Sequence, residues 1–124
     1  MQSYLLVFLG GGIGAATRYW MSGLVHERLG SAFPYGTLAV NILGCFVIGL
    51  IMGSMEERFL SHPSLRVFLT IGILGGFTTF SSFSYETIAM LKDGEFAYAS
   101  LNVFASVLCC LSGTWLGLIA GRTL

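Results

Sequence analysis

Charged residues are scarce in this chain, and their scarcity excludes an ordinary soluble domain. Charged side chains make up 10% of its 124 residues, whereas soluble domains carry about 25%. Lys and Arg together number 6, as do Asp and Glu, so the net charge is zero and no clustered basic surface is available for nucleic acid. We therefore expect no nucleic-acid partner.

Cysteine is also rare. The chain has 3 cysteines, Cys45, Cys109 and Cys110, and all of them lie inside apolar segments. Neither a disulfide framework nor a zinc site finds partners for them at a useful spacing. We interpret them as small packing residues.

The chain is instead rich in long apolar segments. Hydrophobic residues make up 55% of the chain, and each of the long runs can cross a hydrocarbon core, which takes about 20 mostly apolar residues as a helix. The runs are continuous and lack the period-2 alternation of a membrane strand. The sequence therefore predicts an all-α integral membrane protein with one transmembrane domain, residues 1–124. The expected spans are residues 4–24, 35–55, 65–91 and 96–120.

The positions of the basic residues predict how the chain inserts, since Lys and Arg in short loops set the orientation of a membrane protein. With four spans both termini lie on one side, and the basic residues then divide evenly between the two sides. Without a bias, the chain is expected to insert both ways, so that opposite copies can form an antiparallel homodimer. The alternative is a bias of another kind that selects one orientation. The two sets are Arg58, Arg66 and Arg122 against Arg18, Arg28 and Lys92.

Small residues four apart recur in every expected span. Such pairs let helix backbones approach closely in lipid. They fit contacts inside one chain and contacts between two chains equally well. The pairs are Gly10 and Gly14, Gly49 and Gly53, Gly72 and Gly76, and Gly113, Gly117 and Gly121.

The third expected span holds an unusual polar segment. Three glycines, Gly72, Gly75 and Gly76, precede the run FTTFSSFSYE, which ends at Glu86. Irregular backbone at membrane depth is tolerated only where it is buried in protein or lines a wet cavity. We therefore predict a broken helix near Phe77 and Thr78, close to the membrane midplane. In an antiparallel dimer the freed carbonyls of both copies could converge there on Na⁺.

Aromatic and polar side chains follow the predicted break. Phe80 and Phe83 are three residues apart, so both rings can reach one side of the helix. The positive edge of an aromatic ring can receive a small anion, although a core or lipid-facing role explains two phenylalanines as well. Glu86 needs a partner or water at this depth.

Polar residues in the other spans are further candidates. Asn41 shares a helix face with Thr37, and it could bind an ion or simply bond another helix. Arg18 could act in a site or reach the interface as an anchor. The fourth span carries a polar stripe that could line the same path or bond its own helix. The stripe is Asn102, Ser106, Cys110 and Thr114.

Over essentially its whole length the chain resembles the fluoride channels called Fluc or CrcB. Three segments carry the resemblance: GGIGAATRY, ending at Arg18 and Tyr19; GTLAVNILGCFVIG, containing Asn41; and GGFTTFSSFSYE. The resemblance implies a dual-topology dimer with two fluoride pores, each built from both subunits, in a bacterial inner membrane. It implies passive conduction of fluoride out of the cell and no enzymatic activity.

The resemblance also implies roles for particular residues. Phe80 and Phe83 would be the pore phenylalanines, and Asn41 a polar pore residue near the vestibule. The carbonyls of Gly75 and Thr78 would hold a structural Na⁺. Cys110 departs from the hydroxyl expected at that part of the stripe. The other expected site residues are Thr79, Ser81, Glu86, Arg18, Ser106 and Thr114.

Two other functions fit a chain of four apolar spans. A small multidrug transporter also has balanced charge, but it needs an acidic residue in its first span, and residues 4–24 contain none. A purely structural membrane subunit explains the packing glycines. It does not explain the polar segment of the third span.

Overall fold

The computed structural model of the chain is entirely helical in the part it describes, which is residues 1–124 without the side chains of residues 57, 59 and 60. The first two helices are α1 (Gln2–Leu29) and α2 (Tyr35–Ser61). The third expected span is built from α3 (Pro63–Arg66), the π-helix η1 (Val67–Leu74), α4 (Gly75–Phe77) and α5 (Phe80–Lys92). The last helix is α6 (Phe96–Arg122). The predicted all-α architecture is confirmed.

The break in the third span is also confirmed. The helix stops after Phe77, and α5 begins at Phe80. The break falls near the middle of the 30-residue segment Pro63–Lys92. The π-helical turns of η1 just before it were not expected. A π-helix inside an α-helix often marks a functional segment.

Three of the helical segments are long and apolar enough to cross a membrane: Tyr35–Glu56, Pro63–Lys92 and Phe96–Arg122. Their mean hydropathies are 2.2, 1.5 and 2.0. The first expected span is a helix of 28 residues, which is long enough, but it is not among these three. Its glycines and Arg18 make it less apolar. It also extends past the expected end at residue 24 to include the exposed Glu27.

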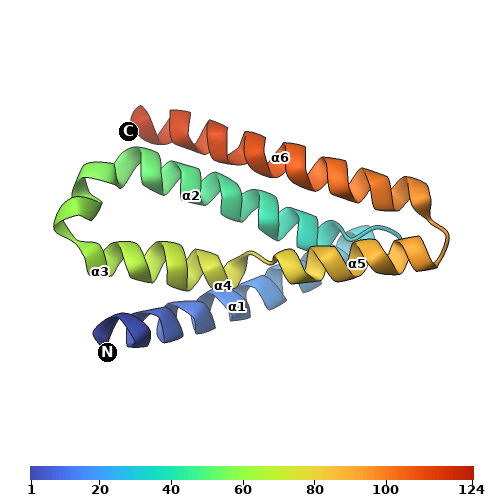
Figure 1. Cartoon of the computed structure of the whole chain (residues 1–124), viewed down its shortest axis with the longest axis horizontal. Helices are drawn as coiled ribbons and strands as arrows, with labels where there is room; N and C mark the ends of the chain where they lie inside the picture. Colours follow the sequence, from blue (N-terminus) through green and yellow to red (C-terminus); the bar gives the residue numbers. More distant parts are fainter.

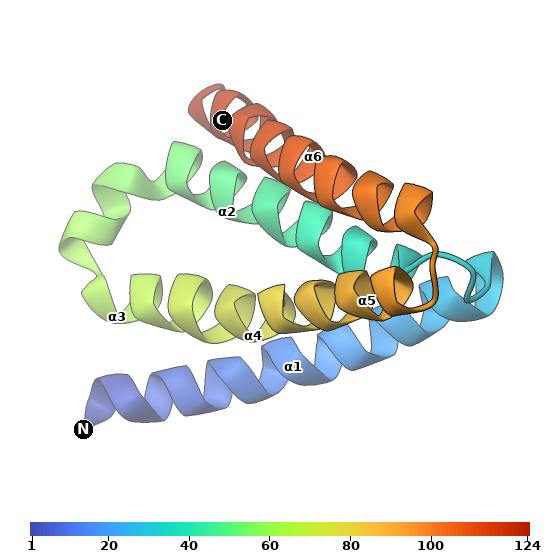
Figure 2. The ribbon, with the colours of Figure 1, turned by 45° about the vertical axis from the view of Figure 1, so that its right-hand side comes forward.

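The helices form a bundle in which both chain ends lie at the same end of the molecule (Figure 1). Helix α2 runs between α6 and the broken third span, and α1 lies along the other side of that span (Figure 1). The turned view keeps the same neighbours, with α6 beside α2 and α1 beside α4 (Figure 2). Helix α1 also contacts η1 and α2. Helix α5 contacts α6. Helix α2 and the third span therefore both lie between α6 and α1.

Glycines set the closest of these contacts. A Cβ on Gly14 would overlap the carbonyl of Ile73, and one on Gly76 would lie 2.5 Å from the carbonyl of Gly11, so α1 and the third span meet backbone to backbone. On the other side, a Cβ on Gly117 would overlap the carbonyl of Phe46 in α2. Close approach of this kind needs residues without a side chain. The predicted glycine pairs thus serve contacts inside one chain.

Candidate functional site

The break is a short extended segment of two threonines. Thr78 has φ −86° and ψ 157°, and Thr79 has φ −152° and ψ 116°. The first threonine is still tied to the preceding helix, since its amide and its hydroxyl both donate to the carbonyl of Leu74, at 3.0 and 2.9 Å. Regular helical hydrogen bonding ends there, so the backbone groups that follow need other partners.

The side chain of Asn41 on α2 supplies those partners for Thr79. Its Nδ2 donates to the carbonyl of Thr79 at 2.9 Å, and its Oδ1 accepts from the amide of Thr79 at 2.8 Å. Both backbone groups of the extended residue are therefore satisfied by one amide 38 positions away in the chain. Asn41 stabilises the break by pairing with it as a neighbouring strand would.

Thr79 begins the second half of the span. Its hydroxyl accepts from the amide of Ser82 at 3.2 Å, which is the usual capping bond at a helix start. The same hydroxyl lies 3.2 Å from the hydroxyls of Ser81 and of Ser82. The positive end of the α5 dipole, with its unpaired amides, is therefore surrounded by hydroxyl groups, and such an end favours anions.

Arg18 contacts the break from the opposite side. Its Nε donates to the carbonyl of Gly76 at 3.1 Å, which links α1 to the last turn before the break. The guanidinium is partly buried in this position. Arg18 is thus bonded to the third span, and it brings a positive charge close to the break.

The main-chain carbonyls of Gly75 and Thr78, on either side of the Gly76 carbonyl that bonds Arg18, are available as ligands for a cation. In the part of the chain that the structure describes, no side chain donates to the carbonyl of Gly75 or of Thr78. Gly75 is exposed on the surface of the single chain, and the extended conformation of Thr78 takes its carbonyl out of the helical pattern. Free main-chain oxygens are the ligands that broken membrane helices offer to Na⁺.

A groove of about 510 Å³ lies beside the break. Phe80 and Phe83 line it with their ring centroids 5.3 Å apart and their planes tilted by 53°. Phe80 is 79% exposed, so the groove is open on this side of the single chain. Ser106 and Cys110 line it from α6. The remaining lining residues that were predicted as site residues are Asn41, Gly75, Thr78 and Thr79.

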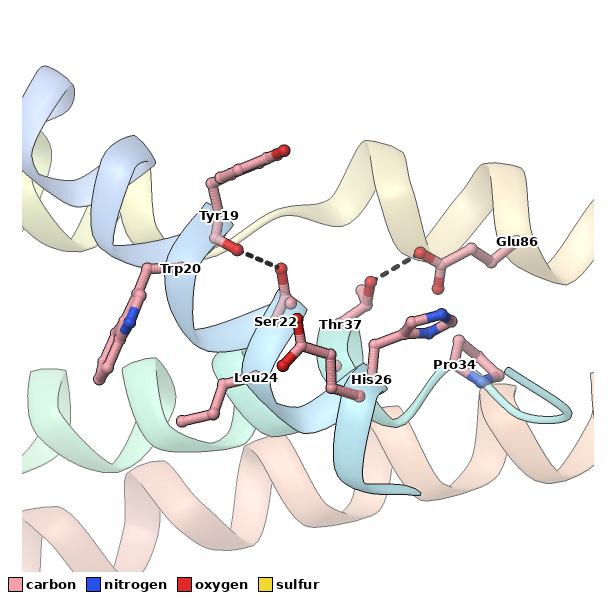
Figure 3. A pocket seen from close by; sticks show the side chains of 11 residues that line it. Tyr19, Trp20, Ser22, Leu24, His26, Pro34, Thr37 and Glu86 are labelled. Carbon is pink, nitrogen blue, oxygen red and sulfur yellow. Dashed lines mark hydrogen bonds between the residues drawn. The ribbon is translucent and has the colours of Figure 1, made fainter. Parts of the chain in front are cut away.

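A second cavity, of about 600 Å³, lies toward the loop between α1 and α2. Figure 3 shows Thr37 and Glu86 pointing toward each other at this cavity, and the Thr37 hydroxyl donates to Oε1 of Glu86 at 2.6 Å. The other carboxylate oxygen, Oε2, is buried and has no hydrogen-bond partner among the described residues. Tyr19 and His26 line the cavity from α1.

The polar stripe of α6 divides between two roles. Ser106 and Cys110 face the groove. Asn102, at 1% exposure, instead donates to the hydroxyl of Thr87 on α5 at 3.0 Å. Thr114 donates to the carbonyl of Cys45 on α2 at 3.1 Å. The two ends of the stripe therefore hold α6 to its neighbours, and Thr114 lies outside both cavities.

Thr37 and Cys45 were not predicted as site residues, although both lie at the cavities. Thr37 shares a cavity and a hydrogen bond with Glu86, and its position one turn before Asn41 was the available signal. Cys45 lines the groove opposite α6, and nothing in its local sequence distinguishes it from a packing residue. Ser81 and Arg18 lie at the break but line neither cavity.

Comparison with known proteins places the chain among relatives that match it throughout. Residues 5–118 match the family model described as CrcB-like protein, Camphor Resistance (CrcB). A "Fluoride-specific ion channel FluC" of Geotalea daltonii is 55% identical over 122 residues, which cover 98% of both chains. A protein of the same name from Geobacter sulfurreducens is 54% identical over 124 residues, the whole of both chains.

Proposed function

This chain belongs to the CrcB family, and from that premise we propose that it works as a fluoride-selective channel of the bacterial inner membrane. Fluoride enters a cell as neutral hydrofluoric acid and ionises in the less acidic cytoplasm, where the anion is trapped. A passive pore lets it leave down its gradient. The relatives that match the full chain are named as fluoride-specific channels, and the protein acts as a channel rather than an enzyme.

The observation that carries the proposal is that residues from three different helices line one groove. Asn41 comes from α2, Phe80 and Phe83 from α5, and Ser106 from α6. Hydroxyls and the positive end of α5 lie next to the two rings. This combination suits a small anion, because the ring edges and the helix end are both positive.

The two cavities follow one another along the same pair of helices. Thr37 lies one turn before Asn41 on α2, and Glu86 lies three residues after Phe83 on α5, so each helix contributes to both cavities. An ion that leaves the groove between these helices meets the Thr37 and Glu86 pair next. We place the conduction path along this line, with Thr79 and Ser81 beside it at the break.

Selectivity against chloride follows from the chemistry of the lining. A narrow path that removes hydration favours the ion whose lost water is best replaced by fixed partial charges. Fluoride is small and strongly hydrated, so hydroxyl donors and ring edges at close range suit it better than chloride. Arg18 adds positive charge near the break without lining the groove.

The decisive experiment is anion efflux from liposomes that contain the purified protein, with fluoride or chloride inside. We expect fluoride to leave quickly and chloride to leave no faster than from empty liposomes. Equal rates for the two anions would contradict a fluoride channel. Proton-driven uptake of a cationic dye in place of anion efflux would favour a small multidrug transporter.

The same proposal includes an antiparallel homodimer with two pores, each completed by both copies. Three features support it: the even division of basic residues, the groove that is open in the single chain, and Phe80, which is 79% exposed there. Helix α1 would be the fourth span, at about 42 Å for its 28 residues. A cysteine added at the C-terminus should be labelled from one side of the membrane in only part of the population. Labelling of every copy from a single side would contradict dual topology.

A structural Na⁺ at the two-fold axis of that dimer completes the proposal. The carbonyls of Gly75 and Thr78 from both copies would hold the ion, and its charge would fix the two breaks against each other. Because the ligands are main-chain oxygens, Thr78→Ser should leave Na⁺ affinity nearly unchanged. Gly75→Val should weaken it. Na⁺-dependent thermal stability of the purified dimer measures both, and equal stability with Na⁺ and with K⁺ would contradict the site.

A further inference from the structure

Two cysteines from different helices face each other at the groove. Cys45 on α2 and Cys110 on α6 both line it, and neither forms a disulfide. Both side chains are half-buried. Among the described residues no other pair of cysteines lines the groove, since Cys109, the third cysteine, is not one of its lining residues.

The backbone around this pair is held firmly. Thr114 on α6 donates to the carbonyl of Cys45 at 3.1 Å, and a Cβ built on Gly113 would lie 3.9 Å from the Cβ of Cys45. Cys110 precedes these two residues by three and four positions, so it lies on the same face of α6. The two cysteines are therefore brought to the same groove by a tight contact between α2 and α6, and not by flexible loops.

We infer that Cys45 and Cys110 form a two-thiolate binding site for a soft metal ion such as Hg²⁺, Ag⁺ or Cu⁺. Thiolate is the protein ligand that such ions prefer, and two sulfur atoms complete a linear coordination. Binding of Hg²⁺ forms two sulfur–mercury bonds and releases the two thiol protons to solvent, with no change of oxidation state. Mercuric chloride is a neutral molecule, so it can reach a site inside a membrane.

Because the pair lies in the groove, we expect metal binding there to affect conduction. This expectation rests on the proposed function. Cys45 and Cys110 share the groove with Asn41, Phe80 and Phe83. Binding leaves the net charge of the site unchanged, because Hg²⁺ replaces two protons, but an ion bound between the two sulfurs occupies part of the groove and narrows the path. Bound Hg²⁺ should therefore slow fluoride efflux strongly.

Cys109 provides a matched control within the same helix. It is the next residue to Cys110 but is exposed and does not line the groove. It presents an equally reactive type of side chain on a different face of α6. Any binding of Hg²⁺ to a single thiol of this chain should therefore also be seen at Cys109.

The test uses the purified protein and Hg²⁺ as the probe, followed by a thiol-alkylating reagent and mass spectrometry. With one metal ion per chain, we expect Cys45 and Cys110 to be protected together while Cys109 is alkylated. The parent and Cys109→Ser should behave alike, and Cys110→Ser or Cys45→Ala should lose the protection of the remaining partner. Alkylation of either Cys45 or Cys110 in the metal-loaded parent would overturn the site.

Fluoride efflux from liposomes is the second readout. Hg²⁺ should slow efflux at least about tenfold in the parent and in Cys109→Ser, equivalent to about 1.4 kcal/mol in the barrier. Efflux through Cys110→Ser should be insensitive to the metal. If the parent conducts no fluoride at all, the proposed function fails, while the alkylation pattern still decides the metal site. Equal block of parent and Cys110→Ser would overturn the consequence for conduction.

Discussion

Helix α2 meets two of its neighbours, α6 and the broken third span, through contacts of opposite kinds. Against α6 it has glycines, and the backbones touch: a Cβ on Gly49 would overlap the carbonyl of Thr114. Against the broken third span it has Asn41, whose side chain bonds both backbone groups of Thr79. The first contact is close because side chains are missing. The second is stable because one side chain replaces missing backbone bonds.

This difference separates the contacts that hold the bundle together from the residues that we expect to act in conduction. A contact between glycine backbones buries no group that could bind an ion, so it serves packing alone. A break in a membrane helix is costly unless every freed polar group has a partner. Here the partners are Asn41, the Thr79 hydroxyl and Arg18, and they leave other polar groups and two phenylalanine rings at an open groove. We therefore expect changes at the break to affect conduction and changes at the glycines to affect folding.

The largest effect is expected at the rings of the groove. Phe80→Ile and Phe83→Ile conserve most of the volume, which usually costs under about 1.5 kcal/mol in stability. The ring edges are lost, and leaving a buried anion partly uncompensated costs several kcal/mol. Fluoride efflux should therefore fall by about a hundredfold or more, while the protein elutes as the parent does on size exclusion.

A phenylalanine outside the groove serves as the control for that change. Phe104 on α6 is 65% exposed and lines neither cavity. Phe104→Ile should conduct as the parent does. Parental flux in both groove variants would mean that the rings are structural and that the path lies elsewhere.

The next largest effect is expected at the amide that bridges α2 and the break. Asn41→Leu leaves the amide and the carbonyl of Thr79 without their partner, and each buried unsatisfied group costs about 1–3 kcal/mol. The variant should be less stable by several kcal/mol and should conduct poorly. Thermal unfolding in detergent and fluoride efflux measure the two effects. The neighbouring change Ile42→Leu is the control, and equal stability of the two variants would contradict the bridging role.

A smaller effect, confined to folding, is expected at the glycine contact. Gly117→Ala forces a Cβ against the carbonyl of Phe46, and overpacking of this kind typically costs about 1–3 kcal/mol. Gly12→Ala is the matched control, because a Cβ there meets nothing within 4 Å, and alanine favours a helix over glycine by up to about 1 kcal/mol. Thermal unfolding should move in opposite directions for the two variants. A shift of Gly117→Ala toward higher stability would refute the close backbone contact.

The smallest effect is expected at the cap of α5. Thr79→Ala removes the hydroxyl that accepts from the amide of Ser82 at 3.2 Å, and loss of such a cap costs about 1 kcal/mol. Thr79→Ser keeps a hydroxyl and should retain most of that stability. Unfolding midpoints compare the two. If serine is as destabilising as alanine, the contribution of Thr79 comes from its methyl group or from the extended backbone.

Much of the fold was open to prediction because hydropathy and helix breaking are local properties. Runs of apolar residues predict helices wherever these helices later pack. The helices of the structure lie within a few residues of the expected spans, except that the first two helices extend further at their ends. The break was predictable because Gly75 and Gly76 followed by Thr78 and Thr79 disfavour a helix in any surroundings.

The contacts across the bundle were decided by the tertiary structure alone. The same glycine pairs fit contacts within a chain or between chains, and only the packed bundle shows that Gly14, Gly49 and Gly117 meet backbones of their own chain. Asn102 and Thr114 belong to one polar stripe with Ser106, yet they bond α5 and α2 and do not face the groove. A helical stripe spans a wide arc, so its members meet different neighbours according to how the helix is tilted and rotated.

The sequence by itself determined that this chain is a helical membrane protein with a polar break in its third span, since these properties follow from the local cost of placing particular side chains and backbone groups in lipid. The tertiary structure decided which groups satisfy the break. Asn41 and Thr79 are 38 positions apart, and Arg18 and Gly76 are 58 apart. Their pairing depends on the relative positions of separate helices, which no local pattern of residues encodes.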